Sequence, residues 1–493
     1  MNKNNQSTTL GGDAIRLTGS KIITLVITML TTMLLSRFRT KTEYGTYSQL
    51  LLVINLFTSL LMLGLPNSIN YFLARAETQE ERQRFLSVYY TLSTALSILI
   101  GALLVVSVPL IEAYFHNTLI RGFWYFLALY PWAHIISASI ENLLVVYKKT
   151  RFLMAYRVVH SAALLGSVLI VQWLGYGFTA YMIAFIVINC LFCLSVYFIA
   201  GRLSGGIRFL FDQSLIRTVF TFSIPIGLAA VVGTLNAEID KLLIGYLMDT
   251  EQLAIYTNAA KELPIAIVAS SITAVLLPQL TRMVKNNRSL EAMKLWGYAT
   301  ELAYAIIALI VAGVFVYAEE AMTILYSEKY LPGVDVFRVY TLNLLLRCTY
   351  FGIVLNAFGK TKKIFFCSLI SLGLNIILNP LFYWIFGMIG PAIATFLAIF
   401  LVLLLQLKMT SKITNIAFCK VFPWRSIMLL TLLNASMALV FWSIKKLLPL
   451  EMLIGEIGES LALGALWTVI YLFVMKKYLL SKWHDLNRKG EDE

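Results

Sequence analysis

The chain has 493 residues, of which 59% are hydrophobic and only 13% are charged. Soluble proteins carry about 25% charged residues, so this composition predicts a membrane protein with many spanning helices and excludes a large soluble domain. The net charge of +14 does not indicate nucleic-acid binding, because no basic run is long enough to line a groove.

A spanning helix needs about 20 mostly apolar residues, and fourteen segments of the sequence meet this requirement. In chain order, the predicted spans centre on residues 14–36, 45–65, 86–111, 122–146, 152–172, 178–200, 215–247, 252–280, 295–317, 334–358, 364–384, 387–407, 426–444 and 457–475.

The loops between these spans carry their charges unevenly. With an even number of spans, both termini lie on the same side of the membrane. The loops on that side hold most Lys and Arg, for example Lys148, Lys149 and Arg151, whereas the opposite loops are short and contain acids such as Glu319 and Glu320. Basic loops mark the cytoplasmic side, so both termini are predicted to be cytoplasmic.

Nothing in the sequence indicates an enzyme. It has no H-E-x-x-H, no P-loop and no Ser/His/Asp set, and its four His residues lack ligand spacing. The short outer loops also disfavour membrane glycosyltransferases, polymerases and ligases. We therefore predict no catalytic residues, no metal and no cofactor.

Four landmarks recur in the same order roughly 210 residues apart. They are TEYGTY and TEQLAIY, LGLPNS and VLLPQL, VYKKTRF and AFGKTKK, and GYGFTA and GMIGPA. Each copy contains six spans, an even number, so both copies enter the membrane from the same side. Parallel repeats of this kind are related by an axis along the membrane normal and suit alternating access.

The predicted fold class is therefore an all-α integral membrane protein with about fourteen transmembrane helices. Two parallel six-helix bundles are predicted, related by pseudo-two-fold symmetry and followed by two further helices. The predicted boundaries are 1–205 for the N-terminal lobe, 206–420 for the C-terminal lobe, and 421–493 for the two extra helices and a cytoplasmic tail.

Charged side chains lie inside several predicted spans, where each costs roughly 2.5–3.5 kcal/mol. At about 1.5 Å per residue, Glu238, Asp240 and Lys241 of the seventh span lie roughly 14 Å below the outer edge of the membrane. Lys261 and Glu262 of the eighth span lie at a similar depth. Glu238 and Lys241 are three residues apart and share a helix face, while Asp240 points elsewhere, so Lys261 is its predicted partner.

Two interpretations of these charges stay open. One is a network of salt bridges that joins helices, and the other is the lining of a water-filled substrate cavity. The candidate substrate-binding cations are Arg16, Lys21, Lys241, Lys261 and Arg347, and the candidate coupling or structural acids are Glu141, Glu238, Asp240 and Glu262. For Arg16 and Lys21, contact with lipid phosphates is an alternative. Cations at several depths favour a phosphate-bearing substrate over a cationic drug.

Proline residues predict breaks in three spans. Pro225, with Gly227, is expected to interrupt the seventh span. Pro264 and Pro278 are expected to interrupt the eighth, and Pro66 to end the second.

The chain resembles the oligosaccharide/polysaccharide flippases, the Wzx-type branch of the multidrug/oligosaccharidyl-lipid/polysaccharide exporter superfamily. The resemblance rests on EIDKLLIGYL followed by AIYTNA, on the opening GDAIRLTGSKIITLVITML, and on TEYGTYSQ and FGKTKK. Asp240 and Lys241 match the family's seventh-helix pattern, whereas Ala254 stands where Gly is more usual. The other cations are candidates for substrate binding only because of their predicted depth in the membrane.

The resemblance implies a transporter that flips a polyprenyl-diphosphate-linked oligosaccharide, such as an O-antigen, capsule or exopolysaccharide repeat unit. It implies movement from the inner to the outer leaflet of the bacterial plasma membrane through a cationic cavity. The expected partners are this glycan lipid, membrane lipids, a glycan polymerase and glycosyltransferases, with a proton or sodium as the coupling ion. A multidrug-type cation antiporter and a flippase for lipid II or teichoic-acid precursors stay open as alternatives.

Overall fold

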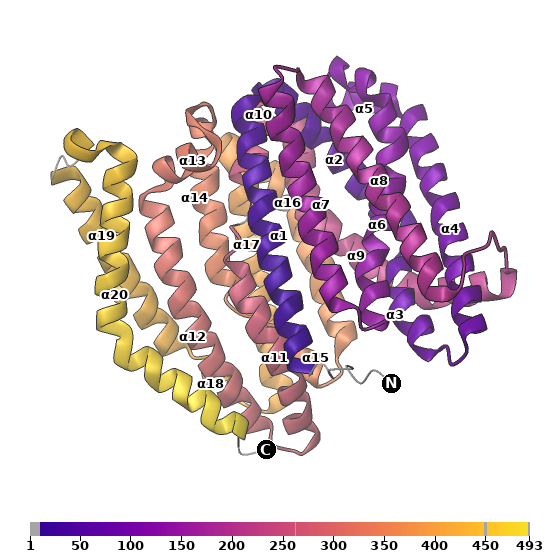
Figure 1. Cartoon of the computed structure of the whole chain (residues 1–493). Coiled ribbons are helices and arrows are strands. Elements are labelled where there is room, and N and C mark those ends of the chain that lie inside the picture. The colour runs from indigo at the N-terminus through magenta and orange to yellow at the C-terminus, as the bar shows by residue number, and fades with distance from the viewer. Residues whose placement is uncertain (1–9, 262, 448–450, 492–493) are drawn as a thin grey trace, which may run out of the picture. The chain divides into compact units, whose positions relative to one another are not determined.

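A computed structural model describes residues 10–261, 263–447 and 451–491 of the chain, and all regular secondary structure in these ranges is helical (Figure 1). Helices satisfy every backbone hydrogen bond within one segment, which a span in lipid requires. The helices group into two compact units, residues 1–254 and 255–493. The predicted all-α class is confirmed.

The N-terminal unit contains nine long or short α-helices among its described residues, and a tenth helix, α10, crosses the boundary between the units. Their bounds are α1 Leu10–Phe38, α2 Lys41–Met62, α3 Leu65–Arg75, α4 Gln79–Val106, α5 Val108–Phe115, α6 Trp124–Val146, α7 Thr150–Trp173, α8 Phe178–Ser204, α9 Gln213–Leu247 and α10 Thr250–Ala259, with the 3-10 helix η1 at Thr118–Phe123.

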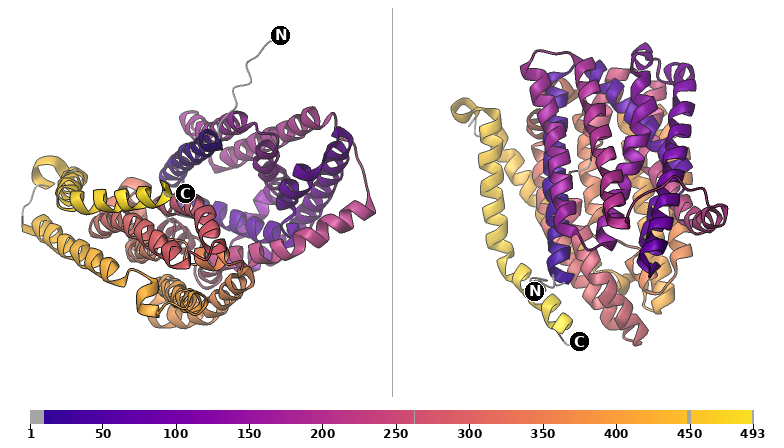
Figure 2. Two further views of the ribbon diagram at one scale, coloured as in Figure 1. Left: turned by 90° about the horizontal axis from the view of Figure 1, so that it is seen from below. Right: turned by 45° about the vertical axis from the view of Figure 1, so that its right-hand side comes forward.

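In the C-terminal unit, shorter helices alternate with long ones. Their bounds are α11 Ala266–Lys285, α12 Ser289–Val316, α13 Ala318–Tyr326, η2 Glu328–Gly333, α14 Val334–Asn343, η3 Leu344–Arg347, α15 Ile353–Ala357, α16 Thr361–Phe386, η4 Gly387–Ile389, α17 Gly390–Thr414, α18 Phe418–Val421, α19 Trp424–Leu447 and α20 Glu451–Glu491. Within each unit most of the long helices run roughly along one direction (Figure 2).

All fourteen predicted spans overlap helices in the described part of the chain. Ten helical runs among the described residues are long and apolar enough to cross a membrane, and one of them, Thr361–Thr414, contains both α16 and α17. The remaining three predicted spans fall on α6 and on two interrupted segments, α10 with α11 and α14 with α15.

The proline predictions are partly wrong. Pro264 lies in the break between α10 and α11, as predicted, but α9 continues through Pro225 and α11 continues through Pro278. A long helix tolerates the loss of the one backbone hydrogen bond that proline removes. The second span ends before Pro66, which instead occupies the first turn of α3, where a missing N–H needs no partner.

The units do not follow the predicted lobe boundary at residue 205. Helix α9, which the sequence repeat assigns to the second lobe, packs on α2 and α3 and belongs to the N-terminal unit. The repeat and the contacts between helices therefore divide the chain at different places. The lobe boundaries at residues 205 and 420 stay a prediction.

Glycine permits the close approach of α9 to the turn between α2 and α3. A Cβ added at Gly227 would lie 2.0 Å from the carbonyl carbon of Leu63 and 2.2 Å from its oxygen. Small residues allow two backbones to approach within a membrane, where apolar surface alone gives no preference for a helix over lipid. Gly227 thus determines how α9 packs on this turn.

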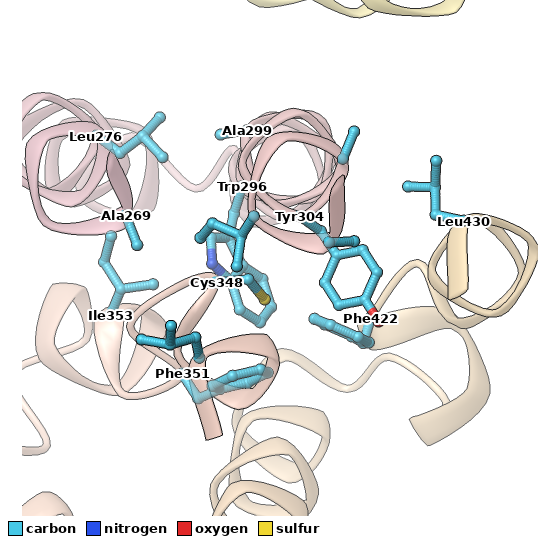
Figure 3. Packing of buried hydrophobic residues seen from close by; sticks show 14 of the residues in the cluster. Ala269, Leu276, Trp296, Ala299, Tyr304, Cys348, Phe351, Ile353, Phe422 and Leu430 are labelled. Atoms are coloured by element: carbon cyan, nitrogen blue, oxygen red, sulfur yellow. The ribbon is translucent and has the colours of Figure 1, made fainter. Parts of the chain in front are cut away.

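The core of the C-terminal unit surrounds Trp296 (Figure 3). Trp296 is fully buried and lies against Phe351 and Phe422, with ring centroids 6.3 and 5.9 Å away. Its indole N–H donates to Thr349 Oγ1 at 2.8 Å, which satisfies the one polar group of a large apolar side chain.

Polar contacts join the last helix, α20, to α12. Lys482 Nζ lies 2.7 Å from Glu301 Oε2, and Tyr478 donates to the same oxygen at 3.1 Å. Tyr471 donates to the Ala305 carbonyl at 2.9 Å. The predicted two-helix addition, as far as it is described, therefore packs as part of the C-terminal unit.

We expect Gly227→Ala to destabilise the protein by about 1–3 kcal/mol, the usual cost of overpacking a close contact. The measurement is the unfolding temperature of the full chain in detergent. Gly233→Ala on the same helix is the matched control, because an added Cβ there meets nothing within 4 Å. Equal unfolding temperatures for the two variants would contradict the packing described for Gly227.

Candidate functional site

The charged stretch of α9 forms an ion pair within one helix. Lys241 Nζ lies 2.8 Å from Glu238 Oε2 and donates to the Ala237 carbonyl at 3.1 Å. The predicted i,i+3 contact is therefore confirmed. Because the two charged groups lie 2.8 Å apart and only about a fifth of each side chain is exposed, each charge largely neutralises the other.

Asp240 points away from this pair and is almost fully buried, with 2% of its surface exposed. Its Oδ1 accepts from the backbone N–H of Lys241 at 2.8 Å. One turn further on, the motif glycine Gly245 is packed tightly, because an added Cβ would lie 2.6 Å from the Phe115 ring. The local pattern of α9 thus combines one buried acid, one ion pair and one close packing position.

A second charged group joins α1, α6 and α7 of the same unit. Glu141 Oε1 lies 3.3 Å from Lys21 Nζ, and its other oxygen pairs with Arg157. We call Lys21, Glu141 and Arg157 the charged triad, and it carries one net positive charge. The sequence places Arg157 as a charge inside the fifth predicted span, but only Lys21 and Glu141 were predicted as site residues.

A cavity of about 610 Å³, the N-terminal cavity, lies between α2, α3, α6 and α9 in the N-terminal unit, and apolar surface makes up most of its lining. Its polar lining consists of neutral amides, hydroxyls and one imidazole, together with a single carboxylate, that of Glu238. These residues are Asn55, Thr58, Ser59, Asn67, His134, Thr234 and Glu238. The sequence analysis did not predict this cavity, because its residues come from four separate helices and form no motif.

A polar network connects the beginnings of α2 and α10. Glu251 pairs with Lys41 Nζ at 2.9 Å and accepts from Thr42 Oγ1 at 2.9 Å. Gln49 donates to Thr250 Oγ1 at 3.2 Å and accepts from Asn117 at 2.6 Å. The hydrogen bonds from Lys41 and Thr42 lower the pKa of Glu251.

This network joins the two copies of the repeated motif. TEYGTY begins at Thr42 and TEQLAIY at Thr250, so Glu251 corresponds to Glu43, and Glu251 contacts Lys41 and Thr42 at the start of the first copy. The repeat marked both segments in the sequence but did not predict their contact.

In the C-terminal unit, Arg347 lies where the tenth predicted span unwinds. The 3-10 helix η3 ends at Arg347, and α15 begins only at Ile353. Arg347 lines a cavity of about 610 Å³ together with hydroxyl and amide side chains, among them Thr273, Ser371 and Gln406. Unwound backbone inside a membrane protein is found where it is buried in protein or lines a cavity, and in transporters it often forms the substrate or ion site.

The other nominated residues are less defined. Lys261 is exposed and lies between α10 and α11. The side chain of Arg16 and the whole of Glu262 fall outside the described part of the structure. The predicted contact of Asp240 with Lys261 would join the two units and stays a prediction.

Comparisons with known proteins agree on the kind of molecule. A family model described as "Polysaccharide biosynthesis protein" matches residues 34–335, more than half of the chain. The chain is 23% identical over 216 residues to the capsular polysaccharide biosynthesis protein CapF of Staphylococcus aureus. That match covers 42% of this chain and 54% of CapF, so the chain spans about half the length of this relative.

Two solved structures have a similar fold. The lipid II flippase MurJ in an inward closed conformation has a TM-score of 0.73 at 16% identity, covering 94% of this chain and all of that one. An inward-facing multidrug resistance transporter of the MATE family has a TM-score of 0.62 at 14% identity, covering 82% and 99%. At these identities the likeness shows the fold, which confirms the predicted fold class. Family, fold and the apolar helices together indicate a multi-pass membrane protein.

Within the charged triad, we expect Arg157→Gln to destabilise the protein more than Lys21→Gln does. The Arg157 side chain is 15% exposed and that of Lys21 is 58% exposed, so Arg157 contributes more to neutralising Glu141. The expected losses are about 1–3 kcal/mol for Arg157→Gln and below about 1 kcal/mol for Lys21→Gln. Thermal unfolding in detergent measures both, and the reverse order would contradict the geometry of the triad.

The lowered pKa of Glu251 predicts a pH-dependent contribution to stability. A carboxylate whose folded pKa is depressed stabilises the fold above its ordinary value of 4.5, and this contribution is lost as the pH falls through the lowered pKa. The difference in unfolding temperature between the wild type and Glu251→Gln should therefore be constant from pH 7 to pH 5 and shrink below pH 4.5. A difference that stays constant down to pH 3 would show that the ion pair contributes nothing.

Proposed function

Since this chain belongs to the polysaccharide biosynthesis protein family, we propose that it flips a polyprenyl-diphosphate-linked oligosaccharide across a bacterial plasma membrane. The substrate would be the repeat unit of an O-antigen, capsule or exopolysaccharide, moved from the inner to the outer leaflet by alternating access. Both termini would lie in the cytoplasm. CapF, the relative from Staphylococcus aureus, is named for capsular polysaccharide biosynthesis, which supports this substrate class.

The observation that carries the proposal is the charged triad. Lys21 and Arg157 share one carboxylate, that of Glu141, so the group keeps a positive charge inside a membrane protein. A diphosphate would replace Glu141 as the partner of these cations. Arginine binds phosphate through two parallel hydrogen bonds, and lysine binds it as a point charge.

Arg347 is the second candidate for the diphosphate, because it lines a cavity at an unwound part of a predicted span. Lys241 is a weaker candidate, since Glu238 already neutralises it. Arg16 and Lys261 stay candidates only because the sequence predicts that they lie at a suitable depth in the membrane. The acids Glu141, Glu238, Asp240 and Glu262 are the candidate sites for a driving proton or sodium ion, or for structural pairing.

The alternative of a multidrug-type cation antiporter is less well supported. A cationic drug requires a site with excess negative charge or an aromatic lining. In the N-terminal cavity the single carboxylate, Glu238, is paired with Lys241 at 2.8 Å. A flippase for lipid II or teichoic-acid precursors would use the same diphosphate chemistry and differs only in the sugars carried.

Partners follow from the chemistry of the substrate. Glycosyltransferases must build the lipid-linked oligosaccharide on the inner leaflet, and a polymerase must use it on the outer leaflet. We therefore expect these enzymes to work beside the transporter in the same membrane.

The test is complementation of a deletion strain of the native host with single Gln variants of Lys21, Lys241, Lys261 and Arg347. Each lost contact to a phosphate is worth about 1.5–3 kcal/mol, so surface polysaccharide should fall about ten-fold or more for Lys21→Gln and Arg347→Gln. Lys362→Gln, at the exposed start of α16, is the control and should export normally.

Two results would contradict the proposal. One is unchanged surface polysaccharide in the deletion strain itself. The other is normal export by all four variants at wild-type protein levels, which would rule out a cationic substrate path.

A further inference from the structure

We propose that the N-terminal cavity is a sugar-binding site, whose polar side chains bind the first sugars of the lipid-linked substrate, while the charged triad beside it binds the diphosphate. This inference rests on the proposed function and adds to it the residues that bind the glycan.

The lining of the cavity supplies the hydrogen-bonding groups that sugars need. Each sugar hydroxyl is both a donor and an acceptor, and so are hydroxyl and amide side chains. Asn55 and Asn67 offer amides on one side of the cavity, and His134 offers an imidazole on another. Ser59 and Thr234 hydrogen-bond each other at 2.9 Å across the helices α2 and α9, which joins two walls of the cavity.

The charge of the cavity also fits a neutral ligand. Glu238 is the single ionisable carboxylate among the lining residues, and Lys241 neutralises it. A charged ligand would therefore find no unbalanced charge inside the cavity. A carboxylate held in this way can still accept hydrogen bonds from sugar hydroxyls.

Small residues provide the space. Ala230, Gly233 and Ala237 lie three and four residues apart, so they share one face of α9, and all three line the cavity. A volume of about 610 Å³ lies in the middle of the range of about 300–1,000 Å³ that is typical of small-ligand sites.

The position of the cavity relative to the triad fits a diphosphate followed by sugars. His134, Ala138 and Glu141 occupy one face of α6, four and seven residues apart. The first two line the cavity and the third belongs to the triad. At about 1.5 Å per residue, His134 and Glu141 are roughly 10 Å apart along the helix, a separation that a diphosphate with its first sugar can span.

Amides continue from the cavity toward the triad. Asn142, next to Glu141 on α6, donates to the Pro66 carbonyl at 2.8 Å and accepts from Asn70 at 3.0 Å. Pro66 itself lines the cavity. The polar surface of the cavity is thus linked to the residue beside the triad.

The test fills the cavity without touching the triad. Gly233→Leu introduces a large side chain where an added Cβ meets nothing within 4 Å, and Gly166→Leu on α7 makes the same change at another open position that does not line the cavity. The probes are undecaprenyl diphosphate alone and undecaprenyl diphosphates that each carry one sugar, namely N-acetylglucosamine, N-acetylgalactosamine, galactose or glucose. Their affinities for the full chain in detergent are compared.

We expect the wild type and Gly166→Leu to bind at least one glycosylated probe about ten-fold more tightly than the bare lipid, as one or two retained hydrogen bonds would give. Gly233→Leu should bind all probes with the affinity of the bare lipid, which itself should not change. Asn55→Ala, which removes an amide and adds no volume, should lower the preference about three-fold or more, provided that its unfolding temperature matches the wild type.

The outcomes separate the two proposals. If the wild type binds none of the polyprenyl diphosphates, both the proposed function and the proposed sugar site are wrong. If the wild type binds the bare and glycosylated lipids equally, or if Gly233→Leu keeps the preference for a sugar, the sugar site is wrong and the proposed function stands.

Discussion

The absence of water from the hydrocarbon core is the constraint on which the rest of this structure depends. A charge there must have a partner, and a polar side chain must find a hydrogen bond inside the protein. Glu141 is shared by Lys21 and Arg157 from two other helices, and Glu238 is paired with Lys241 on its own helix. The first arrangement joins three helices, whereas the second neutralises two charges within α9.

The two arrangements have different consequences for function. An i,i+3 pair such as Glu238 and Lys241 is completed within one helix and survives any movement of that helix. The triad joins three helices, so its geometry depends on how α1, α6 and α7 are placed. A ligand that competes for Lys21 and Arg157 would therefore act on the positions of these three helices.

The sequence predicted what short-range physics controls. Span positions follow from local hydropathy, and the Glu238–Lys241 contact follows from helix geometry. The missing N–H of proline was a weaker guide, because Pro264 lies in a break while α9 and α11 continue through Pro225 and Pro278. Contacts between helices were harder to predict, because they depend on how each helix is rotated. The sequence analysis therefore omitted Arg157 from the triad and missed the cavity beside α9 entirely.

The unwound stretch after Arg347 was also missed, for a related reason. Its sequence, CTYFG, contains no charge and no proline and lies within an otherwise apolar span, so hydropathy does not predict a break there. The structure shows that this segment packs on Trp296. The indole N–H of Trp296 donates to Thr349 Oγ1 at 2.8 Å, and Phe351 packs against the same ring. Tertiary packing in the C-terminal unit thus accompanies the loss of helical structure.

The two copies of the repeated motif use the same glutamate differently. Glu43, in TEYGTY, accepts from the backbone N–H of Thr40 at 2.9 Å and so caps its own helix. Glu251, at the matching place in TEQLAIY, instead accepts from Lys41 and Thr42 beside the first copy. One position of the repeat thus stabilises a helix end in the first copy and a contact between the copies in the second.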